Sequence, residues 1–288
     1  MKYYIAIISL LLMFLSCKKK EPINSNSLLN NQIKTSKVIL KNGETISTRF
    51  LAPKGYKRII PKENSFENYL QNFKLKPSNS KVHLYNGGLK NRQDIHEAVL
   101  DINVGKRDLQ QCADATMRLR AEHLFMQKKY NAIHFNFTNG FNVAYSKWRK
   151  GYRLKVVGNN VSWFKTDEES TSYASFYQYM QWIFMYAGTL SLDKELQSVP
   201  IKDMKIGDIF IQGGSPGHAI IVVDMAKNSE NEAVFIVAQS YMPAQEIHIL
   251  KNLNSPKNSP WYSAKNLETL QSPEWAFTKH NLKRFSTE

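Results

Sequence analysis

The sequence has few or none of several features that would assign a protein to a particular class. Its 288 residues include only two cysteines, Cys17 and Cys112, which excludes a disulfide-rich scaffold. It has no internal repeat and no long low-complexity tract. The apolar run at the N-terminus, Ile5 to Leu15, has about eleven residues and is too short to span a bilayer. The remaining composition, with 42% apolar and 12% aromatic residues, is typical of a packed globular protein.

The N-terminus has the pattern of a targeting segment. Lys2 precedes the apolar run, and the run ends in Phe14-Leu15-Ser16-Cys17, which resembles a bacterial lipobox. That resemblance implies cleavage before Cys17 and lipidation of its thiol and amine, so residues 1–16 would be a lipoprotein signal peptide. The polar residues after Cys17 favour this over a plain secretory signal with an incidental cysteine. We expect residues 17–40 to be a flexible tether and the mature chain to be lipid-anchored to a membrane of the bacterial cell envelope, facing the periplasm or the surface.

Positive charge exceeds negative charge. The 39 Lys and Arg residues against 24 Asp and Glu residues give a formal net charge of +15. The lysines are scattered and form no dense basic helix or known nucleic-acid motif, so we expect no nucleic-acid partner. Attraction to an anionic surface, either lipid or cell wall, suits an exported protein better.

The most informative segment is Gly207 to Asp224, GDIFIQGGSPGHAIIVVD. Its Gly/Ser/Pro stretch separates two apolar runs, Ile209–Ile211 and Ala219–Val223, so we expect two strands joined by a turn. The second run is mostly β-branched and predicts a strand buried on both faces. His218 opens that strand beside Gly217, where a backbone or a substrate can approach closely. Such a histidine suits proton transfer near neutral pH, although an arbitrary histidine is more often a surface or capping residue.

The segment from Asp108 to Tyr130 predicts the clearest helix of the chain. Asp108, with Gln111 three residues later, fits an N-terminal capping box and places Cys112 in the first turn. There the unpaired backbone N–H groups and the positive end of the helix dipole favour a thiolate. With Cys17 lipidated, Cys112 is a lone thiol that cannot form an internal disulfide, so it is either a buried core residue or kept for chemistry.

Other segments predict further elements of an α+β protein. Ala233–Gln239 is expected to pair with Ala219–Val223 as a hairpin. We also expect short strands and turns over residues 38–62, helices at Ser65–Leu70 and Ser172–Ala187, and strands at Lys81–Tyr85, Ala98–Val104, His134–Thr138, Arg153–Gly158 and Pro243–Leu250.

Cys112, His218 and a polar residue on the next strand have the order of a Cys-His-polar triad. Cys112 would be the nucleophile and His218 the base that takes and returns its proton, while Gln239 would orient the imidazole. The hairpin would put His218 and Gln239 at one end of the sheet. Asp224 lies at the opposite end and is a poorer orienter, whereas His248 is an alternative to Gln239. The backbone N–H of Cys112 would be one oxyanion donor.

The segment around His218 resembles the Gly-His segment of NlpC-type and CHAP-type papain-like hydrolases, which cleave peptide or amide bonds in bacterial cell wall. The resemblance covers about Gly207 to Gln239 and implies that His218 and Gln239 match the histidine and third polar residue of those families. Cys112 matches in kind their cysteine, which starts an upstream helix. The chain departs from the pattern because Ala113 and Asp114 stand where small residues such as Ser-Gly usually follow that cysteine. The distance along the chain from Cys112 to His218 is also long for the compact members.

A second resemblance covers nearly all of the chain after the tether. Runs such as DLQQCADATMRLRAEHL, HFNFTNGF and AQSYMPAQEIHIL resemble a family of bacterial lipoproteins that carries a domain of unknown function. This resemblance implies no activity.

The candidate metal ligands outside the triad are three histidines, His123, His134 and His248. Their spacing fits no metal-ligand motif, and the chain supplies no further cysteine. We therefore expect no metal and no other cofactor.

The sequence thus predicts that residues 41–288 form a single α+β domain with an N-terminal extension. We expect a papain-like core in which a nucleophile-bearing helix packs on an antiparallel sheet. The predicted function is a cysteine hydrolase of peptide or amide bonds, with peptidoglycan or a peptide as substrate. The alternative is a papain-like domain that has lost its activity and binds or scaffolds components of the cell envelope.

Overall fold

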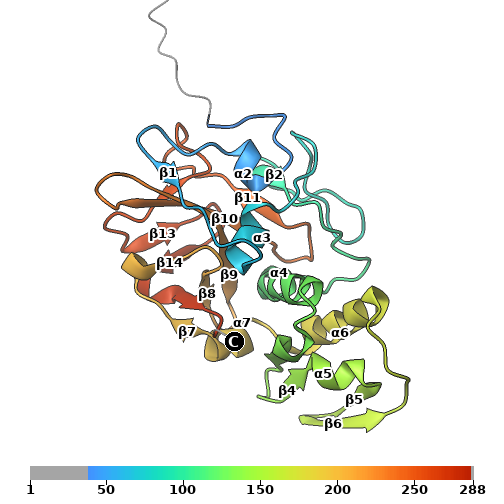
Figure 1. Cartoon of the computed structure of the whole chain (residues 1–288). Coiled ribbons are helices and arrows are strands. Elements are labelled where there is room, and N and C mark those ends of the chain that lie inside the picture. Colours follow the sequence, from blue (N-terminus) through green and yellow to red (C-terminus); the bar gives the residue numbers. More distant parts are fainter. Residues whose placement is uncertain (1–37, 287–288) are drawn as a thin grey trace, which may run out of the picture. The chain divides into compact units, whose positions relative to one another are not determined.

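One antiparallel sheet forms the core of the protein. A computed structural model describes residues 38–286, so the predicted signal peptide, Cys17 and most of the predicted tether lie outside the described residues. The sheet has nine strands, and two of them lie off its main path, namely β1 (Lys57–Arg58), which pairs with β9, and β12 (Tyr262–Ser263), which pairs with β10. Along the main path the strands are β2 (His96–Val99), β11 (His248–Leu250), β10 (Ala233–Gln239), β9 (His218–Lys227), β8 (Ile209–Gln212), β15 (Leu282–Arg284) and β7 (Gln197–Ser198) (Figure 1).

The central strands β8, β9 and β10 carry the apolar runs of the sequence. Every residue of β9 except Lys227 is buried, and the predicted hairpin is confirmed, with Ala238 of β10 opposite Ile221 of β9. β9 is longer than the sequence predicts because Asp224 does not end it. The Asp224 carboxylate accepts hydrogen bonds from Arg58 Nε at 3.0 Å and from Gln71 Nε2 at 2.7 Å, which satisfies a charged group inside the strand.

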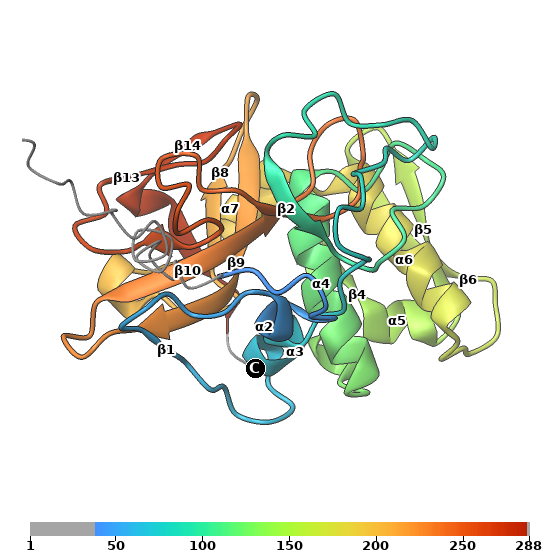
Figure 2. The same ribbon diagram turned by 90° about the horizontal axis from the view of Figure 1, so that it is seen from above.

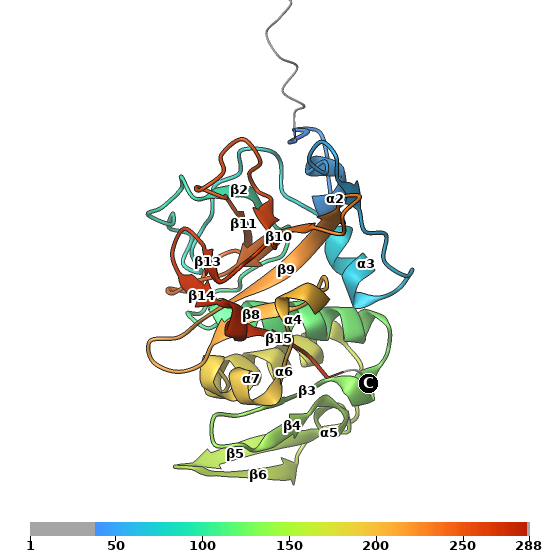
Figure 3. The same cartoon turned by 90° about the vertical axis from the view of Figure 1, so that its left-hand side faces the viewer.

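The helices lie mainly on one side of this sheet. Helix α4 (Cys112–Met126) packs on β9, and Figure 2 shows it between the sheet and α6 (Tyr173–Tyr186). Figure 3 shows the same order from another side, with the two-stranded β5–β6 hairpin furthest from the sheet. The other helices are α2 (Ile46–Arg49), α3 (Phe66–Gln71), α5 (Tyr145–Arg149) and α7 (Thr189–Glu195), with the 3-10 turns η1 (Tyr130–Ala132), η2 (Ile201–Asp203) and η3 (Lys279–Asn281). The outer hairpins pair β3 (His134–Asn136) with β4 (Asn142–Ala144), β5 (Tyr152–Val157) with β6 (Asn160–Lys165) and β13 (Thr269–Gln271) with β14 (Ala276–Thr278).

Helix α4 starts three residues later than the predicted cap implies. Gln111 is the N-cap residue, and its backbone N–H donates to Asp114 Oδ2 at 2.9 Å. Asp108, the predicted cap, instead accepts the backbone N–H of Ala244 at 2.7 Å. Cys112 is therefore the first residue of the helix, in the first turn as predicted.

Several other elements differ from the prediction. The segment over 38–62 contains the short helix α2, capped by Thr45. Lys81–Tyr85 forms only isolated bridges, because the Gln93 side chain bonds the N–H of Val82 at 3.1 Å and its carbonyl at 2.8 Å in place of a neighbouring strand. β2 lies earlier than the predicted Ala98–Val104, and β11 keeps only the last residues of the predicted Pro243–Leu250.

The described residues thus form a mixed α and β protein with an antiparallel sheet and few helices. Within residues 38–286 no helix is both long enough and apolar enough to cross a membrane.

Candidate functional site

A cavity of about 370 Å³ lies where the start of α4 meets the start of β9. We call it the Cys112 pocket. Its walls also come from the α6–α7 junction, the β8–β9 turn, the segment after β10 and the β13–β14 turn. The lining residues are Gln111, Cys112, Ala113, Asp114, Phe184, Ala187, Gly188, Thr189, Gly214, Ser215, Pro216, Gly217, His218, Tyr241, Met242 and Trp275.

Cys112 occupies the first position of α4 and is buried. Its sulfur interacts with the backbone amide of Ala219, the residue that follows His218. Burial, and after it the nearby carboxyl of Asp114, raise the pKa of the Cys112 thiol to about 11. The predicted thiolate at the helix start is therefore wrong for this structure, because loss of hydration outweighs what a helix N-terminus contributes.

His218 is held in a tight and largely aromatic setting. The preceding Gly217 leaves no room for a side chain, since a Cβ there would lie 2.5 Å from both the Gly214 carbonyl oxygen and Thr189 Oγ1. The His218 ring contacts the rings of Tyr241 at 4.9 Å and Trp275 at 5.4 Å, measured between centroids. Burial lowers the pKa of His218 to about 4, so the imidazole is neutral at pH 7.

Gln239 lies against His218, as the hairpin requires. Its Oε1 is 2.9 Å from His218 Nε2 at the end of the sheet where β9 begins and β10 ends. His248, the alternative orienter, contacts Gln239 instead, with 3.3 Å between His248 Nε2 and Gln239 Nε2. Of the two candidates, the structure therefore brings Gln239 to the histidine.

The hydrogen bonds around Gln239 fix which way its amide points. Gln239 Nε2 donates to Glu274 Oε2 at 2.5 Å, and the other carboxylate oxygen of Glu274 accepts from Lys90 Nζ at 2.8 Å. His248 Nδ1 lies 2.9 Å from the carbonyl oxygen of Glu246, which can only accept, so His248 Nδ1 carries a proton and its Nε2 accepts from the Gln239 amide. Both amide hydrogens are then used, which leaves the amide oxygen facing His218.

This arrangement decides the tautomer of His218. A carbonyl oxygen only accepts, so His218 Nε2 carries the proton and Nδ1 keeps its lone pair. A neutral imidazole with a lone pair on Nδ1 can accept a proton from a group in the Cys112 pocket. Within residues 38–286 no hydrogen bond joins the Cys112 thiol to the His218 ring, although both side chains line this pocket.

Asp114 is the one acidic residue among the described residues that line the pocket. Its Oδ2 accepts the Gln111 N–H, whereas its buried Oδ1 has no hydrogen-bond partner in the described part of the chain. Burial raises the pKa of Asp114 well above its usual value.

The histidines that were candidate metal ligands lie in unrelated settings. His123 packs against the rings of Phe66 and Tyr69, and His134 faces Glu195 at 3.5 Å. Over the described range, 38–286, no three His, Cys, Asp or Glu side chains are grouped so that they could hold a metal ion.

Four residues of the site had no signal in the sequence that could have identified them. Glu274 reaches Gln239, and Lys90 reaches Glu274, only through the folding of distant segments, and neither residue belongs to a recognisable motif. Tyr241 and Trp275 pack on His218 from two different loops.

A family model described as Domain of unknown function (4846) matches residues 46–284, a range that contains Cys112, His218, Gln239 and Glu274. No curated protein and no solved structure matches the chain.

Proposed function

The chain belongs to the family described as Domain of unknown function (4846), and we propose that it is a cysteine hydrolase of peptide or amide bonds. In this proposal Cys112 is the nucleophile, His218 the general base and Gln239 the residue that orients the imidazole. The observation that carries it is the His218–Gln239 hydrogen bond of 2.9 Å, which leaves Nδ1 as the proton acceptor in the pocket that Cys112 also lines.

A papain-like arrangement of the core is part of the same proposal. Cys112 begins a helix that packs on an antiparallel sheet, and His218 and Gln239 stand on adjacent strands of that sheet. This order of helix and strands is what the resemblance to NlpC-type and CHAP-type hydrolases implies, and it supports assigning the three residues the same roles.

The reaction would begin from a neutral pair. With the pKa of the thiol at about 11 and that of the imidazole at about 4, the proton rests on sulfur in this structure. His218 Nδ1 therefore takes the thiol proton as sulfur attacks the carbonyl carbon, rather than before substrate arrives. The same Nδ1 then returns the proton to the leaving nitrogen as the C–N bond breaks, which leaves an acyl group on Cys112 as a thioester.

Water completes the cycle. His218 Nδ1 accepts a proton from a water molecule, the hydroxyl adds to the thioester carbon, and the sulfur leaves with that proton, which regenerates the thiol and releases a carboxylic acid. The backbone N–H of Cys112 is at the start of a helix, where no earlier turn supplies an acceptor. It would donate to the oxyanion that forms in both addition steps.

The pocket favours an uncharged or amide-containing group beside the scissile bond. Phe184, Met242 and Trp275 give it apolar walls, and the buried Asp114 carboxyl has an oxygen without a partner in the described part of the chain. An amide N–H of a peptide would satisfy that oxygen. The predicted lipid anchor at Cys17 would hold the domain in the cell envelope, where peptides of the peptidoglycan are the available substrate.

One observation favours a second function, the binding of envelope components without catalysis. A thiol with a pKa of about 11 that makes no hydrogen bond to His218 among the described residues resembles a buried structural cysteine. In that case the pocket would hold a peptide and leave it intact.

An assay on peptidoglycan separates the two functions. Purified protein is incubated with peptidoglycan and with soluble peptide fragments from it, beside Cys112→Ala and His218→Ala, and new amino and carboxyl groups are measured. The hydrolase proposal predicts release by the unchanged protein and none by either variant. Binding of the fragments without release by the unchanged protein, or release that both variants retain, contradicts it.

A further inference from the structure

A second cavity, of about 870 Å³, lies at the opposite end of β9 from His218. We call it the lysine-rimmed cavity. Because Asp224 faces Gln71 of α3, the next residue, Met225, faces the other side of the sheet, where this cavity lies. Its lining comes from Ser198, Val199, Pro200, Ile201, Lys202, Met204, Met225, Lys227, Asn231, Glu232, Ala233, Ala264, Lys265, Asn266, Leu267, Glu268, Lys279 and His280.

The floor of this cavity is apolar. Ile201 and Leu267 are half-buried and present aliphatic atoms to the cavity, and beneath them lie the buried side chains of Met204 and Met225. Methionine is flexible and polarisable, so such a floor adapts to an aliphatic chain without a fixed shape. The volume falls within the range of about 300 to 1,000 Å³ that is usual for ligand pockets.

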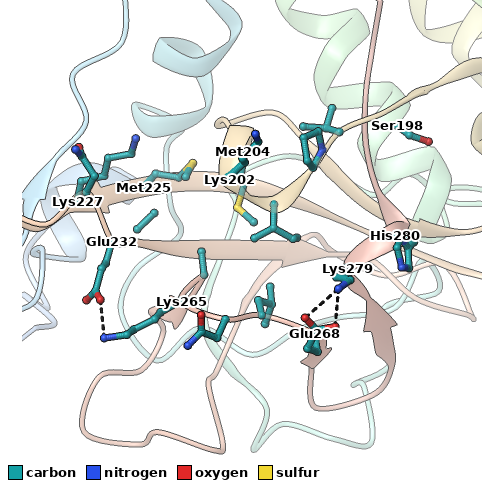
Figure 4. Close-up of a pocket in the computed structure, with 18 residues that line it drawn as sticks. Ser198, Lys202, Met204, Met225, Lys227, Glu232, Lys265, Glu268, Lys279 and His280 are labelled. Atoms are coloured by element: carbon teal, nitrogen blue, oxygen red, sulfur yellow. Dashed lines mark hydrogen bonds and ion pairs between the residues drawn. The ribbon is translucent and has the colours of Figure 1, made fainter.

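The rim carries more positive than negative charge. Lys265 pairs with Glu232 at 2.6 Å and Lys279 pairs with Glu268 at 2.8 Å, so these four charges offset one another. Figure 4 shows both pairs along one side of the cavity and Lys202 and Lys227 along the other.

Lys202 and Lys227 are the rim charges that remain. Neither forms an ion pair with a carboxylate of the described residues. Two ammonium groups without counter-charges beside an apolar floor are complementary to a molecule with one anionic end and one aliphatic end.

We propose that the lysine-rimmed cavity binds a single-chain anionic amphiphile, with its carboxylate or phosphate head at Lys202 and Lys227 and its tail over Ile201, Leu267 and the two methionines. Lysine carries a compact point charge, so it can bind either a phosphate head or a carboxylate head. The proposal is independent of the hydrolase function, because His218 and Met225 lie roughly 20 Å apart along the extended strand.

The test is calorimetric titration of the purified protein with decyl phosphate below its critical micelle concentration. Decyl glucoside, with the same tail and no charge, and inorganic phosphate, with the head group alone, are the comparison probes. The double variant Lys202→Gln/Lys227→Gln is compared with Lys54→Gln/Lys62→Gln. These control lysines are exposed, lie outside the cavity and remove the same total charge.

The proposal predicts one decyl phosphate per chain and at least tenfold weaker binding of decyl glucoside and of inorganic phosphate. Each methylene removed from the tail weakens binding by up to about fourfold. Lys202→Gln/Lys227→Gln loses at least tenfold in affinity for decyl phosphate, and the control variant changes by less than twofold.

Three results overturn the proposal. Equal affinity for decyl phosphate and decyl glucoside shows apolar contact without recognition of the anion. Equal loss in both double variants shows a general effect of net charge. Tighter binding of an acidic peptide than of decyl phosphate at the same two lysines shows that the site recognises a polyanion instead.

Discussion

The two ends of strand β9 differ in how firmly their side chains are held. At its first residue, His218 has its tautomer set by a hydrogen-bond network that reaches Lys90 through Gln239 and Glu274. At its last residue, Lys227 stands beside a floor of methionine and other aliphatic side chains with no carboxylate partner in the described structure. The side chains at the His218 end are held in one geometry, which proton transfer requires. The side chains at the Lys227 end can adapt their contacts, which the binding of a flexible chain requires.

The largest expected effect comes from removing the nucleophile. Cys112→Ala changes a small buried side chain for another, so the fold and the lysine-rimmed cavity should stay intact. We expect hydrolysis to fall by about a thousandfold or more, with decyl phosphate affinity unchanged, measured by peptide release and by calorimetry on one preparation. A parallel loss of hydrolysis and of decyl phosphate affinity would mean that the two ends of β9 are coupled and do not act separately.

The next effect tests the network behind His218. Glu274→Ala removes the acceptor that directs the Gln239 amide, so the amide can turn and the Nε2–H tautomer of His218 loses its support. We expect kcat to fall roughly tenfold to a hundredfold with KM little changed. Nitrogen NMR of the His218 ring should show a mixture of tautomers in the variant and a single Nε2–H form in the unchanged protein.

Glu274→Gln is the matched control for that variant. Its amide oxygen still accepts from Gln239 Nε2, although its ion pair with Lys90 is lost. Activity should therefore recover part of the way toward that of the unchanged protein. Identical losses in the Ala and Gln variants, with no change of tautomer, would assign Glu274 a role in folding only.

The pH dependence of thiol alkylation gives a smaller but graded test. Burial raises the pKa of Cys112 to about 11, and the thiolate is the reactive form, so the reactive fraction at neutral pH is small and grows as pH rises. The rate of iodoacetamide labelling at Cys112, followed by mass spectrometry, should climb about tenfold per pH unit from pH 7 to 10. A plateau reached below pH 8 would reveal a preformed thiolate and contradict the neutral pair.

The smallest expected effect is that of the cavity lysines on catalysis. Lys202→Gln/Lys227→Gln should change peptide hydrolysis by less than twofold, because sites this far apart without shared partners act additively. Kinetics of hydrolysis with and without decyl phosphate measure this directly. If decyl phosphate changes the rate of peptide hydrolysis several-fold and the double variant does not show this change, the two sites are not independent. The cavity would then regulate catalysis.

The sequence predicted those parts of the site that local patterns determine. The strand that His218 opens, the strand that Gln239 ends and the helix that carries Cys112 follow from apolar periodicity and from turn residues. The predicted cap of that helix, Asp108, lies three residues before the observed cap, Gln111, because the tertiary fold brings the N–H of Ala244 to Asp108 and the N–H of Gln111 bonds Asp114 instead.

The parts that could not be predicted depend on contacts between distant segments. Glu274 reaches Gln239 only because the β13–β14 turn folds over the end of β10, and no spacing in the chain records that. The raised pKa of Cys112 results from burial, which a helix start in the sequence does not reveal. The lysine-rimmed cavity gathers residues from five separate segments, so scattered lysines gave no sign of it.

The most direct test of the central claim is the mass of Cys112 during turnover. The protein is mixed with peptidoglycan fragments, quenched in acid and digested, and the Cys112-containing peptide is weighed. The proposed mechanism predicts a peptide fragment attached to Cys112 as a thioester that hydroxylamine removes and that His218→Ala does not form. Release of cleaved product with Cys112 unmodified at every time point, and persisting in Cys112→Ala, would contradict the assignment of Cys112 as the nucleophile.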